Sequence, residues 1–124
     1  MTYNVTIEQK TTYLHAVVTG QNTKENVASY LDDLLRECVS RGFSKVLIEE
    51  RLDGPRLGTS DVFAIVSQAS VRTLGKMKAI AYVDINAEGG LMRFAETVAV
   101  NRALPVTVFS SVADAEKWLL AAER

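Results

Sequence analysis

The sequence predicts an α/β protein, a single domain over residues 1–124 in which a β-hairpin precedes alternating strands and helices. Residues 3–20 hold two segments of alternating apolar residues on either side of Thr11-Thr12, which is typical of a hairpin. Short apolar runs then alternate with amphipathic segments, which is typical of parallel strands joined by helices. We therefore expect a mixed, mostly parallel sheet of about five strands with four helices, built from βαβα units after the hairpin.

The first strand and the first helix are defined by their periodicity. Tyr3, Val5 and Ile7 alternate with polar residues, as expected of a strand with one buried face. Asn22 and Thr23 are candidate caps for a helix that ends at Gly42. The residues predicted to form its buried stripe are Val27, Leu31, Leu34, Leu35 and Cys38.

The middle of the chain reads as strand, loop, helix, strand. "KVLIEE", residues 45–50, predicts a short buried strand, and a loop follows it. Thr59 or Ser60 can cap a second helix. Its predicted inward residues are Val62, Ile65, Val66 and Ala69. "KAIAYVD", residues 78–84, is apolar nearly throughout, as expected of a strand covered on both faces.

The last part of the chain repeats this alternation. A third helix is predicted from the apolar spacing of Leu91, Phe94, Ala95, Val98 and Ala99. "PVTVF", residues 105–109, predicts a final strand, and Ser110 or Ser111 can cap a final helix. The residues expected to face inward from that helix are Ala115, Trp118, Leu119 and Ala122.

Composition excludes several classes of function. The net charge of −1, with acids and bases interspersed, predicts no broad surface for nucleic acid. One cysteine, Cys38, and one histidine, His15, exclude an internal disulfide and any cysteine-rich or multi-histidine metal site. Composition leaves an all-carboxylate site for Mg²⁺ or Ca²⁺ as an open alternative. We expect no cofactor and no metal. No signal peptide and no apolar run near the ~20 residues of a membrane span occur, so we expect a cytoplasmic protein.

Three segments carry a likeness to a known family: "RGFSKVLIEERL", "RFAETVAVNRALPVTVFSS" and "ADAEKWL". They resemble the STAS family, the domain of sulfate transporters and anti-sigma factor antagonists. The likeness is strongest to the SpoIIAA-like, STAS/SEC14-type small bacterial proteins, and with the order of elements it spans nearly the whole chain. It implies the SpoIIAA/STAS-like fold and a regulatory, protein-binding role, and it implies no particular reaction.

The resemblance also implies a phosphoacceptor. Regulatory STAS domains carry a Ser or Thr in an Asp-Ser motif where the second helix begins, and the matching positions here are Thr59 and Ser60. The preceding Asp of the family motif is missing, and Asp61 follows instead. The other interpretation of Ser60 is a plain helix cap, with Asp61 favouring the dipole.

Two loops that follow strands are candidates for binding an anion or a partner. Both helix N-termini are expected at the carboxyl ends of the sheet, where ligands bind in open α/β sheets. The candidate residues are Arg51, Arg56, Asp84, Asn86 and Arg93. The alternative for Arg51 and Arg56 is that they are solvated loop charges that partner Glu50 and Asp53.

An apolar surface is the second candidate. Phe63 and Met92 lie off the main helical stripes, so they are candidates for an apolar patch that binds an acyl ligand or a second copy of the chain. Core packing is the alternative explanation for the apolar residues around them.

No catalytic constellation is evident. The sequence gives His15 no partner, and alternation puts Glu49 and Glu50 on opposite faces of a strand. We therefore expect a non-enzymatic regulatory or protein-interaction module. The alternative is a small carrier or sensor of an apolar ligand, as the SEC14 likeness implies. A third option is an enzyme that uses Asp84 or Glu88.

Overall fold

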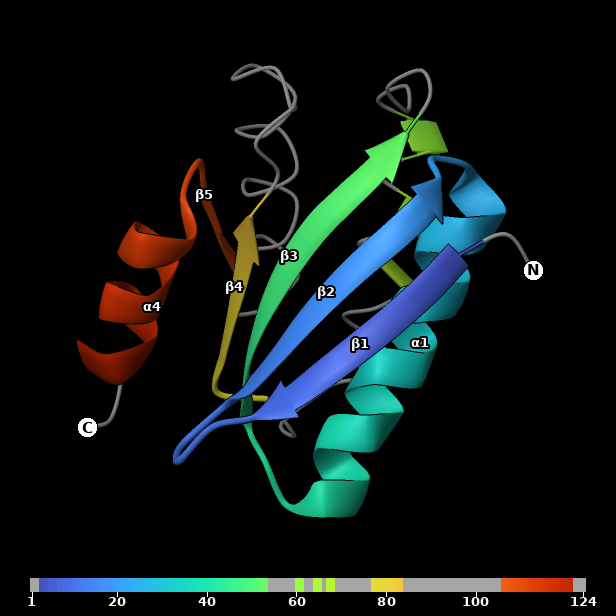
Figure 1. The fold of residues 1–124 in the computed structure, drawn as a ribbon. Helices are drawn as coiled ribbons and strands as arrows, with labels where there is room; N and C mark the ends of the chain where they lie inside the picture. The colour runs from blue at the N-terminus through green and yellow to red at the C-terminus, as the bar shows by residue number, and fades with distance from the viewer. Residues whose placement is uncertain are drawn as a thin grey trace.

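The computed structural model describes residues 3–53, 60–61, 64–65, 67–68, 77–83 and 106–121. Its elements, in chain order, are β1 (Tyr3–Gln9), β2 (Leu14–Gln21), α1 (Lys24–Arg41), β3 (Lys45–Asp53), β4 (Ala79–Val83), β5 (Val106–Phe109) and α4 (Val112–Ala121). The five strands form one sheet in the order β1-β2-β3-β4-β5 (Figure 1).

This architecture confirms the α/β class and the mixed sheet of five strands. β1 pairs with β2 antiparallel, from Tyr3 opposite Gly20 to Gln9 opposite Leu14. The β2–β3, β3–β4 and β4–β5 pairs are all parallel, as predicted for the segments after the hairpin. Of the four predicted helices, α1 and α4 have described bounds. The second and third fall largely or wholly outside the described residues.

The larger part of the core lies between the sheet and α1. Val27, Leu34, Leu35 and Cys38 are buried, and Leu31 is partly buried, which confirms the predicted stripe. These residues pack against alternate residues of the central strands, namely Leu14, Ala16, Val18, Val46, Ile48, Leu52 and Ile80. Tyr3, Val5 and Ile7 extend the same apolar face into β1. Ile65 belongs to this core too, so the second helical segment covers the same face.

α4 covers the opposite face of the sheet, over β3, β4 and β5. Ala115 and Leu119 are fully buried, as predicted. Trp118 is only partly buried and packs on Phe109, with the ring centroids 5.6 Å apart. Ala122 lies outside the described residues.

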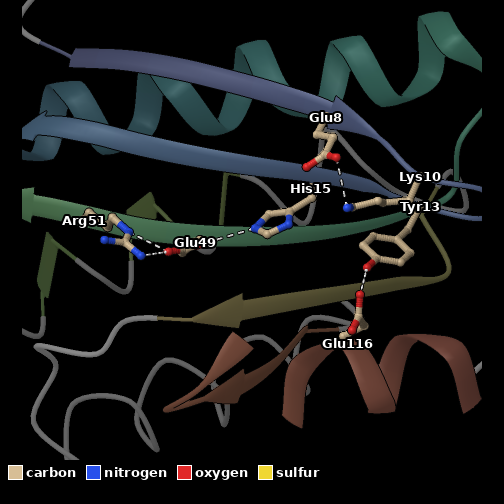
Figure 2. Close-up of polar contacts among 7 residues, drawn as sticks. All are labelled: Glu8, Lys10, Tyr13, His15, Glu49, Arg51 and Glu116. Atoms are coloured by element: carbon tan, nitrogen blue, oxygen red, sulfur yellow. Dashed lines mark hydrogen bonds and ion pairs between the residues drawn. The ribbon is translucent and has the colours of Figure 1, made fainter. Parts of the chain in front are cut away.

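Two polar contacts fasten α4 to the sheet. Lys45 is buried, and its Nζ donates to the carbonyl of Leu119 at 2.8 Å, in the last turn of the helix where carbonyls lack helical partners. The hydroxyl of Tyr13, in the hairpin turn, donates to Glu116 at 2.5 Å (Figure 2). Burial, followed by the Glu116 carboxylate, raises the pKa of Tyr13 to about 12.

β3 is longer than the sequence predicts. The predicted strand ends at residue 50, whereas β3 continues to Asp53. Two interactions extend the strand. Leu52 is buried in the core on the α1 side, and Asp53 pairs with Gln21 at the end of β2. Arg51 is therefore a strand residue and not a loop residue, and its side chain lies on the face away from α1.

Candidate functional site at the carboxyl edge of the sheet

The ends of β2 and β3 meet at one edge of the sheet. Gln21 lies opposite Asp53, and the N–H of Asn22 donates to the carbonyl of Asp53 at 2.6 Å. α1 begins two residues later, at Lys24, so its N-terminus opens at the carboxyl ends of the parallel strands. The sequence predicts this position for the second and third helices, whose N-termini lie outside the described residues. In open α/β sheets this edge is where helix N-termini present N–H groups to ligands.

Thr23 is the residue that caps α1. Its Oγ1 accepts from the N–H of Asn26 at 3.1 Å, while Thr23 itself has extended backbone angles. Asn22, the other candidate, is instead buried in the turn. The Nδ2 of Asn26 donates to the carbonyl of Gln21 at 2.9 Å. Hydrogen bonds thus fix the strand-to-helix turn on both sides of the cap.

The described helical residues Ser60 and Asp61 lie beside this first turn. Ser60 and Asp61 are both helical, and Ser60 is exposed. The carboxylate of Asp61 lies 4.0 Å from the Nζ of Lys24, at a solvent-exposed position. Because Ser60 is already helical, the capping position falls before it, outside the described residues. The structure therefore brings one exposed hydroxyl, one carboxylate and one ammonium together at this edge.

Arg51 forms a different cluster on the face of the sheet away from α1 (Figure 2). Its guanidinium donates to Oε2 of Glu49, and Oε1 of Glu49 lies 3.0 Å from Nε2 of His15. We call these three residues the His15 cluster. The partner of Arg51 is thus Glu49, and not Glu50 or Asp53 as expected for a solvated loop charge.

Glu49 is the centre of the His15 cluster and is 7% exposed. Burial by itself would raise the pKa of this carboxyl. The hydrogen bonds from Arg51 and His15 together outweigh it, so the pKa of Glu49 is held below its usual value. The carboxylate is therefore charged at neutral pH and orients both neighbours.

Sequence reasoning missed this cluster. His15 and Glu49 point to the same face because their strands are parallel neighbours, with His15 opposite Leu47 and Glu49 two residues beyond it. The alternation within each strand was visible in the sequence. The missing information was the sheet order that places β2 beside β3.

A histidine oriented by a carboxylate is half of a catalytic arrangement. The other half is a hydroxyl or thiol that reaches the second ring nitrogen. The single cysteine, Cys38, is on the α1 side of the sheet, and burial raises the pKa of its thiol to about 11. It is a core thiol, as expected. The described residues contain no group of three or more side chains that could hold a metal ion.

Glu50 lies on the opposite face from Glu49, as alternation predicts. The hydroxyl of Tyr30, on α1, donates to Oε2 of Glu50, and both residues are buried between α1 and the sheet. Burial, then the charge of Glu50 and contacts with Tyr82, raise the pKa of Tyr30 well above its usual value. The two carboxylates are separated by the sheet, so they do not act on one substrate.

The other candidate residues lie outside the described residues. They are Thr59, Arg56, Asp84, Asn86, Glu88, Arg93, Phe63 and Met92. Their roles stay predictions. No described helix is long and apolar enough to cross a membrane.

No family model and no curated protein matches the chain. Solved structures do match, and they show that the chain has the STAS/SpoIIAA-like fold, which confirms the predicted resemblance. One of them is the crystal structure of an anti-sigma factor antagonist from Mycobacterium paratuberculosis, with a TM-score of 0.57 and 15% identity. The match covers 95% of this chain and 94% of that one.

Proposed function

We propose that this protein is a non-enzymatic regulatory module that acts by binding a protein partner, and that the partner is an anti-sigma factor. The observation that carries the proposal is the shared fold with an anti-sigma factor antagonist over 95% of the chain.

The proposed contact surface is the carboxyl edge of the sheet. Ser60 is exposed there, and Lys24 and Asp61 form an exposed pair at 4.0 Å, which contributes little stability and leaves Lys24 available to another anion. A phosphate on Ser60 or Thr59 would add close to two negative charges beside Asp61. It would attract Lys24 and repel an acidic partner surface, and in this way it would tune binding. Arg56, Asp84, Asn86 and Arg93 are proposed to extend the surface.

The test is a binding titration against the purified anti-sigma factors of the organism that encodes this chain. We expect one of them to bind the wild type. Ser60→Asp and Thr59→Glu should each weaken that binding by about tenfold, or about 1.4 kcal/mol, because the new charge lies in the contact surface. Ser60→Ala should bind as the wild type does.

Ser40→Asp is the matched control, because Ser40 is exposed at the far end of α1. It should leave the affinity unchanged. Absence of binding to every anti-sigma factor would contradict the assigned partner. Equal affinity of the wild type and both acidic variants would contradict the assigned surface and leave the partner intact.

Native mass spectrometry of protein from its own cells separates this proposal from its alternative. A phosphate-sized addition mapped to Thr59 or Ser60 would support the regulatory switch. A retained acyl ligand would support the carrier, for which Phe63 and Met92 are the candidate contacts. Both of those residues lie outside the described residues, so the carrier gains no support from the described geometry.

A further inference from the structure

β1 is an edge strand, and no strand among the described residues pairs with its outer side. It lies at one end of the sheet, and its pairing in the described part of the chain is with β2 alone (Figure 1). The outward N–H and C=O groups of such a strand form a template for another strand. Native proteins usually protect these edges with charges, prolines, bulges or very short strands.

β1 lacks most of these protections. It is seven residues long and contains no proline, and its first five residues carry no charge. Its one charged residue, Glu8, is near its end, where it pairs with Lys10 at 3.1 Å. The opposite edge strand, β5, is only four residues long and is therefore protected by its shortness. The unprotected edge is thus confined to one side of the sheet.

The sequence of β1 is complementary to itself. When two copies run antiparallel with a two-fold axis at Thr6, all seven residues find a partner. Val5 then lies opposite the partner's Ile7, and both belong to the apolar face on the α1 side. Asn4 lies opposite the partner's Glu8 on the other face, so a carboxylate meets an amide and no like charges meet. A register centred on Val5 or Ile7 pairs fewer residues of the strand.

We propose that two copies of this chain associate through β1, in this register, to form one continuous sheet across a two-fold dimer. Side chains directly opposite each other in an antiparallel pair lie on the same face. Both faces of each sheet therefore continue into the partner without a break. A two-fold interface of this kind is closed, because each copy uses its β1 edge once. The other edge strand, β5, is too short to extend the sheet, so association stops at the dimer.

The test uses charge at the symmetry axis. Thr6 is exposed in the single chain, so Thr6→Lys should fold normally, but it places two ammonium groups opposite each other in the dimer. Multi-angle light scattering should give the wild type twice the chain mass of 13.6 kDa and Thr6→Lys the single mass. Thr19→Lys is the matched control, because Thr19 is exposed on the same face of β2 and away from the edge. It should stay dimeric.

A mixture of Thr6→Lys and Thr6→Glu should restore the dimer, because only the register centred on Thr6 places this position opposite itself. Circular dichroism on each variant checks that it is folded. A wild type that stays monomeric at high concentration would overturn the proposal. So would a Thr6→Lys protein as dimeric as the wild type, and so would a mixture that fails to associate, since that outcome excludes the register.

Discussion

Glu49 carries a buried charge on the face of the sheet away from α1. The pKa of Glu49 is lowered in the folded state, so its charged form stabilises the folded protein. This stabilisation is fully present above the usual carboxyl pKa of 4.5. It is lost as the pH falls through the lowered pKa of the folded state. Part of the fall in the free energy of unfolding at acid pH should therefore come from this side chain.

We expect Glu49→Gln to lower the free energy of unfolding by about 1–3 kcal/mol at neutral pH, because His15 and Arg51 lose a charged acceptor. At an acidic pH below the lowered pKa of the folded state, the difference from the wild type should shrink, since the carboxyl group is then largely protonated. Urea unfolding at both pH values measures it. Glu37→Gln, which breaks an exposed helical pair with Arg41, should cost less than about 0.5 kcal/mol. A Glu49→Gln cost that is independent of pH would contradict the assigned interaction.

α1 is an element whose end depends on one glycine. Gly42 has φ 77° and ψ 25°, the left-handed conformation, and its N–H donates to the carbonyls of Cys38 and Val39. The N–H of Phe43 also donates to the carbonyl of Cys38, at 2.8 Å. This closure turns the chain from α1 into β3, which is how the helix stripe and the central strand come to face each other.

Gly42→Ala should destabilise the protein by about 1 kcal/mol, or about 4 °C in Tm. A Cβ at this position meets no atom within 4 Å, so the whole cost comes from the backbone conformation. Thermal unfolding measures it. Ser40→Ala, exposed in the last turn of the same helix, should be neutral or slightly stabilising. An unchanged Tm in Gly42→Ala would show that the left-handed cap is not required.

The strands of the sheet are buried to different extents. β3 is central and holds buried residues on both faces, against α1 on one side and α4 on the other. β1 has its core contacts on one face and an open edge, and β5 is short and only partly buried. Stability measured along the chain should follow this arrangement.

We expect amide hydrogen exchange to be slowest at Val46, Leu47 and Ile48 and fastest, among the strands, in β5. The amides of β1 that point away from β2 should exchange quickly in dilute protein and more slowly at high concentration, because the dimer covers them. Mass spectrometry at two protein concentrations measures both effects. The amides of β3 serve as the internal control, since they are paired in either state. Exchange in β1 that is independent of concentration would contradict the edge pairing.

The sequence by itself determined the elements whose patterns lie within one short window. The alternation of Tyr3, Val5 and Ile7, the spacing of Val27 to Cys38 and the glycine at 42 each report a local period or a local backbone requirement, and the structure confirms them. The segments that resemble the STAS family predicted the fold that the solved structures show.

The tertiary structure decided what depends on neighbours far apart in the chain. β3 runs on to Asp53 because β2 pairs with it and because Leu52 finds a core to enter. His15 contacts Glu49, which is 34 residues away in the sequence. On the other face, Glu50 accepts a hydrogen bond from Tyr30. Alternation assigns each of these side chains to a face, but it does not say which strand or helix covers that face. Packing decides which element covers each face. It places Arg51, which the sequence suggests is a loop residue, on β3 in the His15 cluster.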